Sequence, residues 1–172
     1  MLLKTKNKAT SLALTGIIGA LYFILCMIFY PISYGGIQVR IAEALTILPI
    51  FFGEAIWGLT IGCLLANFFS PNVPVLDVVF GTLATFISAV ITYFLSKKIK
   101  NPKIGFFIGA FPPVIINAVI VPFTFLAVTE LKELYFISAI EVFLGQALSI
   151  YILGAILYFS LLKYLPKNKI SF

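Results

Sequence analysis

The chain consists of long apolar stretches separated by short breaks that carry lysine, proline or glycine. An apolar run of about 20 residues can cross the roughly 30 Å hydrocarbon core of a bilayer as an α-helix. The pattern predicts helical segments at residues 10–29, 38–52, 54–69, 76–96, 104–128 and 138–165. We therefore expect an all-α integral membrane protein, a compact bundle of six transmembrane helices that forms a single domain over residues 1–172.

Two features of this pattern complicate a simple six-helix bundle. Segments 38–52 and 54–69 reach only about 22–24 Å at 1.5 Å per residue, so a re-entrant pair stays open beside two full crossings. In the fifth segment, Pro112, Pro113 and Pro122 remove backbone donors, which predicts a kink or a break in that helix.

Composition supports the membrane assignment. The mean hydropathy is +1.13 and charged residues make up 10% of the chain, whereas soluble domains have about 25%. The net charge of +6 comes from lysines that flank the apolar runs, which indicates contact with anionic lipid and not with nucleic acid. The chain has no histidine, and its two cysteines lack metal-ligand spacing, so we expect no metal site, no disulfide and no cofactor.

Three lysine clusters set the expected orientation. They precede the first segment, join the fourth to the fifth and close the chain, and they hold ten of the twelve basic residues. With six crossings all three lie on one side, which the positive-inside rule makes the cytoplasm. The prediction is a multi-pass protein of the cell membrane with cytoplasmic N- and C-termini.

Polar side chains are concentrated toward the opposite, outer side. Arg40, the only arginine, lies one helical turn from Glu43 in an apolar stretch, so the two can pair. An ionised group at membrane depth costs about 3 kcal/mol and usually faces a protein interior or a wet cavity. The predicted topology places seven polar side chains in the outer half: Arg40, Glu43, Asn67, Asp77, Asn117, Glu141 and Gln146. Tyr34, before Gly35 and Gly36, and Gln38 complete the candidate binding site.

The inner half carries hydroxyls, including Thr85, Ser88 and Thr92, with Glu54 at its edge. No polar path crosses it, which indicates an outward-facing pocket and not a channel. Structural roles stay open for the candidate residues: an ion pair between Arg40 and Glu43, helix-start carboxylates at Glu54 and Asp77, and interhelical hydrogen bonds of the amides.

The first segment carries small residues at helical spacing: Ala9, Ala13, Gly16 and Ala20. Such a face lets another helix approach closely. The face fits either packing within the bundle or docking to a partner protein.

Several segments resemble the QueT family. They are residues 31–49, with the core Gln-Val-Arg-Ile-Ala-Glu at 38–43, and residues 54–59, 62–70 and 77–85, followed by Asn117 and residues 144–148. The family pattern has a glutamate at the position of Gln146, and Glu141, about one turn earlier, is a candidate replacement.

The resemblance implies an S-component of an energy-coupling factor (ECF) transporter, a six-helix subunit that captures a queuosine precursor. This ligand is a 7-deazaguanine such as queuine or its aminomethyl or cyano precursors. The expected partners are a transmembrane T-subunit, with the small-residue face as docking surface, and two ABC-type ATPases. ATP hydrolysis elsewhere fits the lack of a phosphate-binding loop in the sequence. Glu43, Asp77 and Glu141 against Arg40 leave the pocket with two negative charges, which favours a cationic ligand.

Two other classes are weighed against this hypothesis. An ion- or proton-coupled secondary transporter of an amine-bearing solute would use Glu43 or Glu141 as its carrier carboxylate. An intramembrane enzyme is disfavoured because the chain has no histidine, no Gly-x-Ser-x-Gly and no paired aspartates, and we expect no enzymatic activity.

Overall fold

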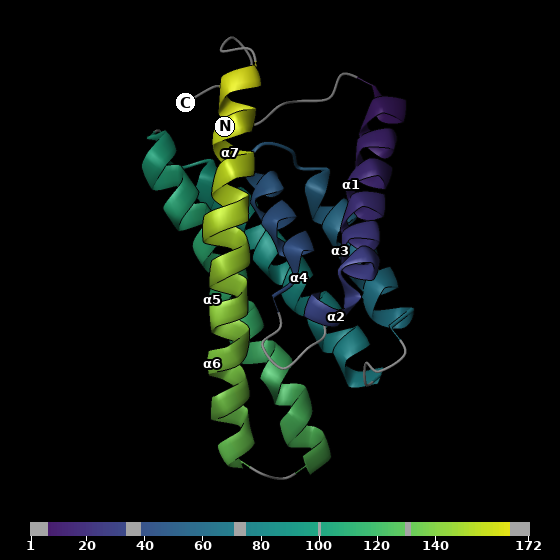
Figure 1. Ribbon diagram of the computed structural model, residues 1–172. Helices are drawn as coiled ribbons and strands as arrows, with labels where there is room; N and C mark the ends of the chain where they lie inside the picture. Colours follow the sequence, from purple (N-terminus) through teal and green to yellow (C-terminus); the bar gives the residue numbers. More distant parts are fainter. Residues whose placement is uncertain (1–6, 34–38, 71–74, 100, 130–131, 166–172) are drawn as a thin grey trace.

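The computed structural model describes residues 7–33, 39–70, 75–99, 101–129 and 132–165, and of 124–129 and 132–133 the backbone alone. The secondary-structure elements of these residues are all helices (Figure 1). The elements are α1 (Lys8–Ile28), α2 (Tyr30–Ser33), the 3₁₀-helix η1 (Ile41–Ile50), α3 (Ala55–Phe68), α4 (Val75–Ser96), α5 (Pro102–Thr129), α6 (Lys132–Leu148), the π-helix η2 (Ser149–Gly154) and α7 (Ala155–Tyr164). The last three follow one another without a break and form one long helix.

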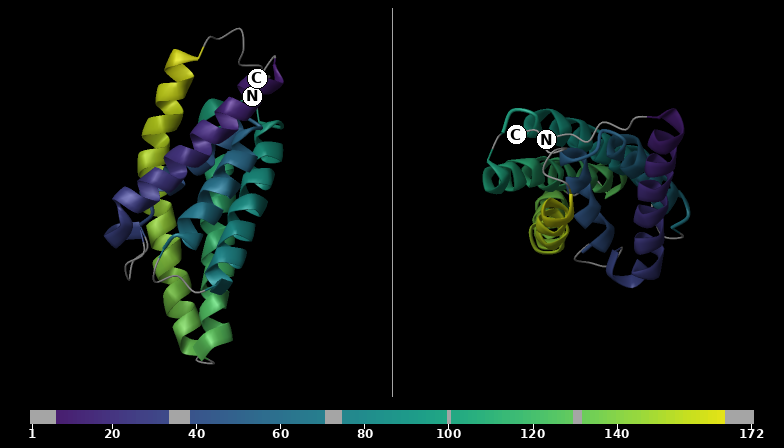
Figure 2. Two further views of the ribbon diagram at one scale, coloured as in Figure 1. Left: turned by 90° about the vertical axis from the view of Figure 1, so that its right-hand side faces the viewer. Right: turned by 90° about the horizontal axis from the view of Figure 1, so that it is seen from above.

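Four helices in the described residues are long and apolar enough to cross a bilayer: Lys8–Ile28, Val75–Ser96, Pro102–Phe123 and Leu134–Tyr164. The remaining apolar helices, Ile41–Ile50 and Ala55–Phe68, are shorter. The prediction of an all-helical, multi-pass membrane protein is confirmed, whereas six full crossings stay a prediction. The start of α1 and the end of α7 lie at the same end of the bundle (Figures 1 and 2), and the side of the membrane that this end faces also stays a prediction.

The second predicted segment differs most from expectation. Instead of an α-helix over 38–52, the structure has the 3₁₀-helix η1, and residues 42–50 are all buried. At about 2.0 Å per residue, ten residues extend roughly 20 Å. η1 contacts α1, α3, α4, α5, η2 and α7, and the view from above shows it between α1 and the α6–α7 helix (Figure 2). A helix that is apolar all round is suited to burial, so η1 is the centre of the bundle and does not face lipid.

Glycines hold α1 and α3 in close contact. A Cβ added at Gly62 would lie 2.7 Å from the Gly19 carbonyl oxygen, and one at Gly58 would lie 2.8 Å from the Thr15 carbonyl oxygen. The spacing of Gly58 and Gly62 is the small-xxx-small pattern that lets helix backbones approach in membranes. This packing fixes α1 against the core without large side chains between the helices.

Helix α5 is unbroken through its prolines, so of the two predicted outcomes the break is wrong and the kink stays a prediction. Pro113 has no N–H to bond the carbonyl of Gly109 four residues earlier. That carbonyl instead accepts a hydrogen bond from Thr92 Oγ1 of α4, at 2.8 Å. A neighbouring threonine thus satisfies the freed backbone group, which is how transmembrane helices tolerate proline.

Candidate functional site

An apolar layer at the centre of the bundle defines where the site begins. Ile47 of η1, Val114 of α5 and Ile150 of η2 belong to one buried cluster. One turn farther from the end that holds the start of α1 lie Glu43 of η1, Asn117 of α5 and Gln146 of α6, the helix that continues into η2. We call these three residues the polar layer. All three are buried, with exposed fractions of 1%, 2% and 5%.

The polar layer contains buried atoms that lack a hydrogen-bond partner among the described residues, and we call such atoms open. Within the part of the chain that the structure describes, the open atoms are Glu43 Oε2, Asn117 Nδ2, Gln146 Oε1, Ser149 Oγ, Ser33 Oγ and Ser70 Oγ. Buried polar groups in proteins are nearly always bonded, so each exception calls for an explanation. Here three open atoms come from η1, α5 and α6, each one turn from a residue of the Ile47–Val114–Ile150 cluster, which is a pattern expected of a ligand site.

Glu43 is held on several sides. Its Oε1 accepts a hydrogen bond from the Tyr22 hydroxyl at 2.6 Å, and Gln146 interacts with the same carboxylate. Its backbone carbonyl accepts a hydrogen bond from Thr46 Oγ1 at 2.6 Å, and its N–H donates to the Arg40 carbonyl at 2.9 Å. The carboxylate is therefore fixed while its second oxygen stays open.

Arg40 precedes η1 and is also buried, with 7% of its surface exposed. Its Nε donates to the Ser33 carbonyl oxygen at 3.4 Å, and its positive charge acts on the Glu43 carboxylate. The two charges therefore act on one another, whereas a direct ion pair between Arg40 and Glu43 stays a prediction. The guanidinium balances the buried negative charge, as a charge at this depth requires.

Asn67 and Asp77 form a second polar group, between α3 and α4. The Asn67 amide donates to the Asp77 backbone carbonyl at 3.3 Å and to Cys63 Sγ at 3.6 Å. Asp77 lies in the first turn of α4, where a carboxylate favours the positive end of the helix. These contacts fit the structural roles left open for both residues.

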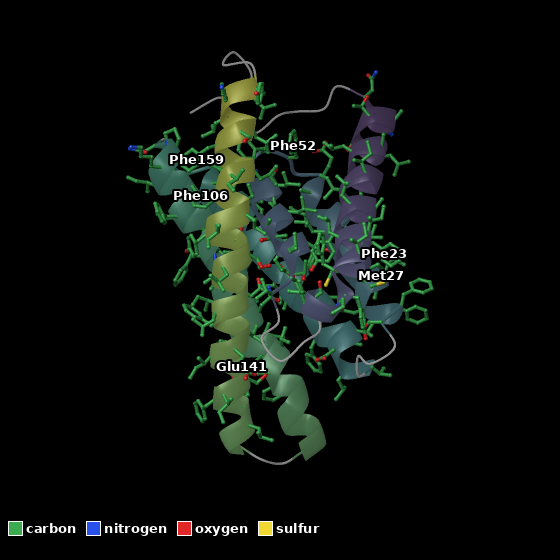
Figure 3. All side chains as sticks on the ribbon, viewed as in Figure 1. Phe23, Met27, Phe52, Phe106, Glu141 and Phe159 are labelled. Carbon is green, nitrogen blue, oxygen red and sulfur yellow. The ribbon has the colours of Figure 1, made fainter. Side chains whose placement is uncertain are left out.

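Three predicted site residues lie elsewhere or outside the described residues. Glu141 is half-buried on α6, and Figure 3 shows its carboxylate beside α5, nearer the α5–α6 connection. It lies five residues from Gln146 and therefore on another face of the helix. Tyr34 and Gln38 fall outside the described residues.

The buried hydroxyls of α4 and the carboxylate of Glu54 all have partners. Thr85, Ser88 and Ser96 donate to carbonyl oxygens of their own helix. Glu54, at the start of α3, accepts a hydrogen bond from Ser11 Oγ at 3.1 Å and so joins α3 to α1. These polar groups are satisfied within the bundle and offer no open atom to a ligand.

The small-residue face of α1 points away from the bundle. Ala9, Ala13, Gly16 and Ala20 are all exposed, and a Cβ at Gly16 would meet no described atom within 4 Å. Packing within the bundle uses a different face of α1, at Gly19. The small-residue face is thus available to a partner.

Two grooves on the outer surface differ from the polar layer. One, of about 310 Å³ between α4 and α5, is lined by apolar residues: Phe80, Leu83, Ile87, Val119, Ile120 and Phe123. The other, of about 390 Å³, lies between α1 and α3 and is lined by Lys8, Ser11, Leu12, Thr15, Trp57 and Ile61. The first offers a polar ligand no hydrogen bond, and the second has none of the open atoms.

Sequence reasoning missed two members of the site environment. Tyr22 was not among the candidate site residues, and the signal that could have found it is its position one turn before Cys26 on the buried face of α1. Ser149 gave no signal in the sequence, and the structure shows it buried at the start of the π-helix. Such π segments are rare and occur often at functional sites.

Comparison with known proteins assigns the family. The family described as QueT transporter matches residues 12–163. The chain is also 35% identical over 98 residues to the queuosine precursor transporter QueT of Lactococcus lactis subsp. cremoris (strain MG1363). That match covers 56% of this chain and 57% of the relative, so it spans little more than half of the curated protein. No solved structure matches the fold. The family match covers most of the chain and confirms the resemblance found in the sequence, and the chain therefore belongs to the QueT transporter family.

Proposed function

We propose that this chain is the membrane-embedded substrate-binding subunit of an ATP-driven ECF-type uptake transporter, and that it captures a queuosine precursor. Family membership and the printed name of the Lactococcus relative support this substrate. The observation that carries the proposal is the polar layer, in which three buried side chains from three segments present open atoms above an apolar floor.

The open atoms suit the edge of a 7-deazaguanine. That edge has two kinds of N–H donor, the ring N–H and the exocyclic amine, beside one carbonyl acceptor. Glu43 Oε2 and Gln146 Oε1 are acceptors, and Asn117 Nδ2 is a donor. In our proposal Glu43 and Gln146 accept from the two donors, and Asn117 donates to the carbonyl. Glu141, Asp77, Asn67, Tyr34 and Gln38 belong to the wider proposed site, where a second carboxylate suits precursors that carry an ammonium.

The apolar floor explains why capture needs partners. Ile47, Val114 and Ile150 close the polar layer toward the end of the bundle that holds the start of α1. A bound solute has no polar route past them, so release on that side requires a larger movement. A T-subunit that docks on Ala9, Ala13, Gly16 and Ala20, driven by two ABC-type ATPases, would supply it.

The first experiment identifies the ligand. Mass spectrometry of small molecules released from protein purified in mild detergent, followed by calorimetric titration, is expected to find a 7-deazaguanine that binds the isolated chain. Glu43→Gln should weaken that binding at least tenfold, about 1.4 kcal/mol. Glu141→Gln, outside the polar layer, should weaken it less. Wild-type protein that binds no 7-deazaguanine would contradict the proposal.

A second experiment tests docking. Gly16→Leu should stop uptake in cells while the isolated protein binds ligand normally, because it adds bulk only to the exposed small-residue face. Leu21→Phe adds bulk at another exposed position of α1 and should leave uptake intact. Uptake by the purified chain alone in liposomes without ATP would favour the ion-coupled secondary transporter instead.

A further inference from the structure

Tyr22 contacts Glu43, but the proposed ligand contacts give Tyr22 no role. Its side chain is completely buried, and its hydroxyl donates to Glu43 Oε1 at 2.6 Å. This length is typical of an O–H donor on an ionised carboxylate, a bond about twice as strong as a neutral one. The bond links α1 to η1 and joins two residues that are 21 positions apart in the sequence.

The position of Tyr22 is fixed by backbone packing. A Cβ at Gly62 would lie 2.8 Å from the Tyr22 Cβ, so the Tyr22 Cβ packs against α3 where that helix has no side chain. Ile18, Cys26, Leu59 and Cys63 belong to the same buried cluster. Tyr22 therefore presents its hydroxyl from a rigid surface.

The bond leaves the two carboxylate oxygens of Glu43 in different situations. Oε1 is occupied by Tyr22, whereas Oε2 is open toward the polar layer. The backbone of Glu43 is fixed by Thr46 and Arg40, so rotation of the side chain is the main freedom that Tyr22 removes. A single oriented acceptor discriminates better between ligands than a carboxylate free to turn.

We propose that Tyr22 is a positioning residue for substrate recognition, which holds Glu43 so that Oε2 alone meets the donor edge of the ligand. The inference rests on the proposed function, because it names the residue that sets the geometry of that site. Its role is to confer preference for a ligand with an exocyclic amine over one without it.

Binding measurements with Tyr22→Phe test the role. With 7-deazaguanine, the dissociation constant should rise about tenfold, and the preference over 7-deazahypoxanthine, which lacks the exocyclic amine, should fall. Tyr158→Phe is the matched control, since Tyr158 is also buried but donates to the Pro102 carbonyl at 2.9 Å, away from the polar layer. In a Glu43→Gln background, Tyr22→Phe should have little further effect. Equal weakening for both ligands, or additive effects of the two substitutions, would overturn the proposal.

Infrared spectroscopy of the ligand-free protein tests the contact independently of the substrate. Tyr22→Phe should shift the carboxylate band that Glu43→Gln removes, and Tyr158→Phe should not. An unshifted band would overturn the positioning role even if 7-deazaguanine binds. A shifted band in a protein that binds no 7-deazaguanine would leave the Tyr22–Glu43 contact intact and reject the proposed substrate instead.

Discussion

The polar layer and the hydroxyl row of α4 place similar numbers of buried polar groups in the same apolar bundle. They differ in whether those groups have hydrogen-bond partners. In the hydroxyl row, formed by Thr85, Ser88, Thr92 and Ser96, every hydroxyl donates to a backbone carbonyl. In the polar layer, formed by Glu43, Asn117 and Gln146, each side chain has an open atom. The hydroxyl row is satisfied within the bundle, whereas the polar layer keeps open atoms, which our proposal assigns to a ligand.

The difference shows how structural and functional polar residues can be distinguished in a membrane protein. An unsatisfied buried group costs about 1–3 kcal/mol, so a bundle without a ligand site has no reason to keep three of them together. Substitutions in the hydroxyl row should therefore lower stability and leave binding unchanged. Substitutions in the polar layer should weaken binding without lowering the stability of the empty protein. The following predictions test this.

The largest effect is expected for Gln146→Met. The thioether fills a similar volume but offers no strong acceptor, so the affinity for 7-deazaguanine should fall ten- to hundredfold, about 1.4–2.7 kcal/mol. Calorimetric titration measures the change. Binding within twofold of wild type would remove Gln146 from the site.

In the hydroxyl row, Thr92→Val should lower stability and leave binding unchanged. The substitution leaves the Gly109 carbonyl without a donor, because Pro113 cannot supply one, at a cost of about 1–3 kcal/mol. Thermal unfolding in detergent measures it. The control is Thr82→Val: Thr82 Oγ1 bonds the Val78 carbonyl, which also has an N–H within its own helix, so a smaller loss is expected. Equal losses would contradict the proline explanation.

Asn117→Leu should raise the stability of the empty protein and weaken ligand binding. It replaces an open amide with an apolar side chain of similar volume, so the empty protein should gain about 1 kcal/mol of stability. Ligand-induced stabilisation should disappear at the same time. A less stable empty protein would indicate that Asn117 serves the bundle and not a ligand.

The smallest effect is expected for Ser149→Ala. The open hydroxyl lies in the π segment beside Gln146, and removing it should change the stability of the empty protein by less than about 0.5 kcal/mol. Any loss of affinity measured by titration should be smaller than that of Gln146→Met. A larger loss would place Ser149 among the primary ligand contacts.

Helix boundaries were largely predictable from the apolar runs. The segments expected at 54–69, 76–96 and 104–128 correspond to α3, α4 and α5 within two residues. The 3₁₀ form of η1 and the π form of η2 were not predictable, because both depend on how two irregular segments pack against each other. That α5 continues through its prolines was not predictable either, since the hydroxyl that donates to the Gly109 carbonyl belongs to a different helix.

The sequence by itself determined the class of protein, the family and the presence of a charged pair in the core, because hydropathy and the Gln-Val-Arg-Ile-Ala-Glu core are properties of consecutive residues. Only the tertiary structure decided which polar residues belong together. It grouped Glu43 with Gln146 and Tyr22, joined Asn67 to Asp77 and left Glu141 on another face. The physical reason is that hydrogen-bond partners are set by contacts between distant segments, and an open atom is recognised only when all of its neighbours are known.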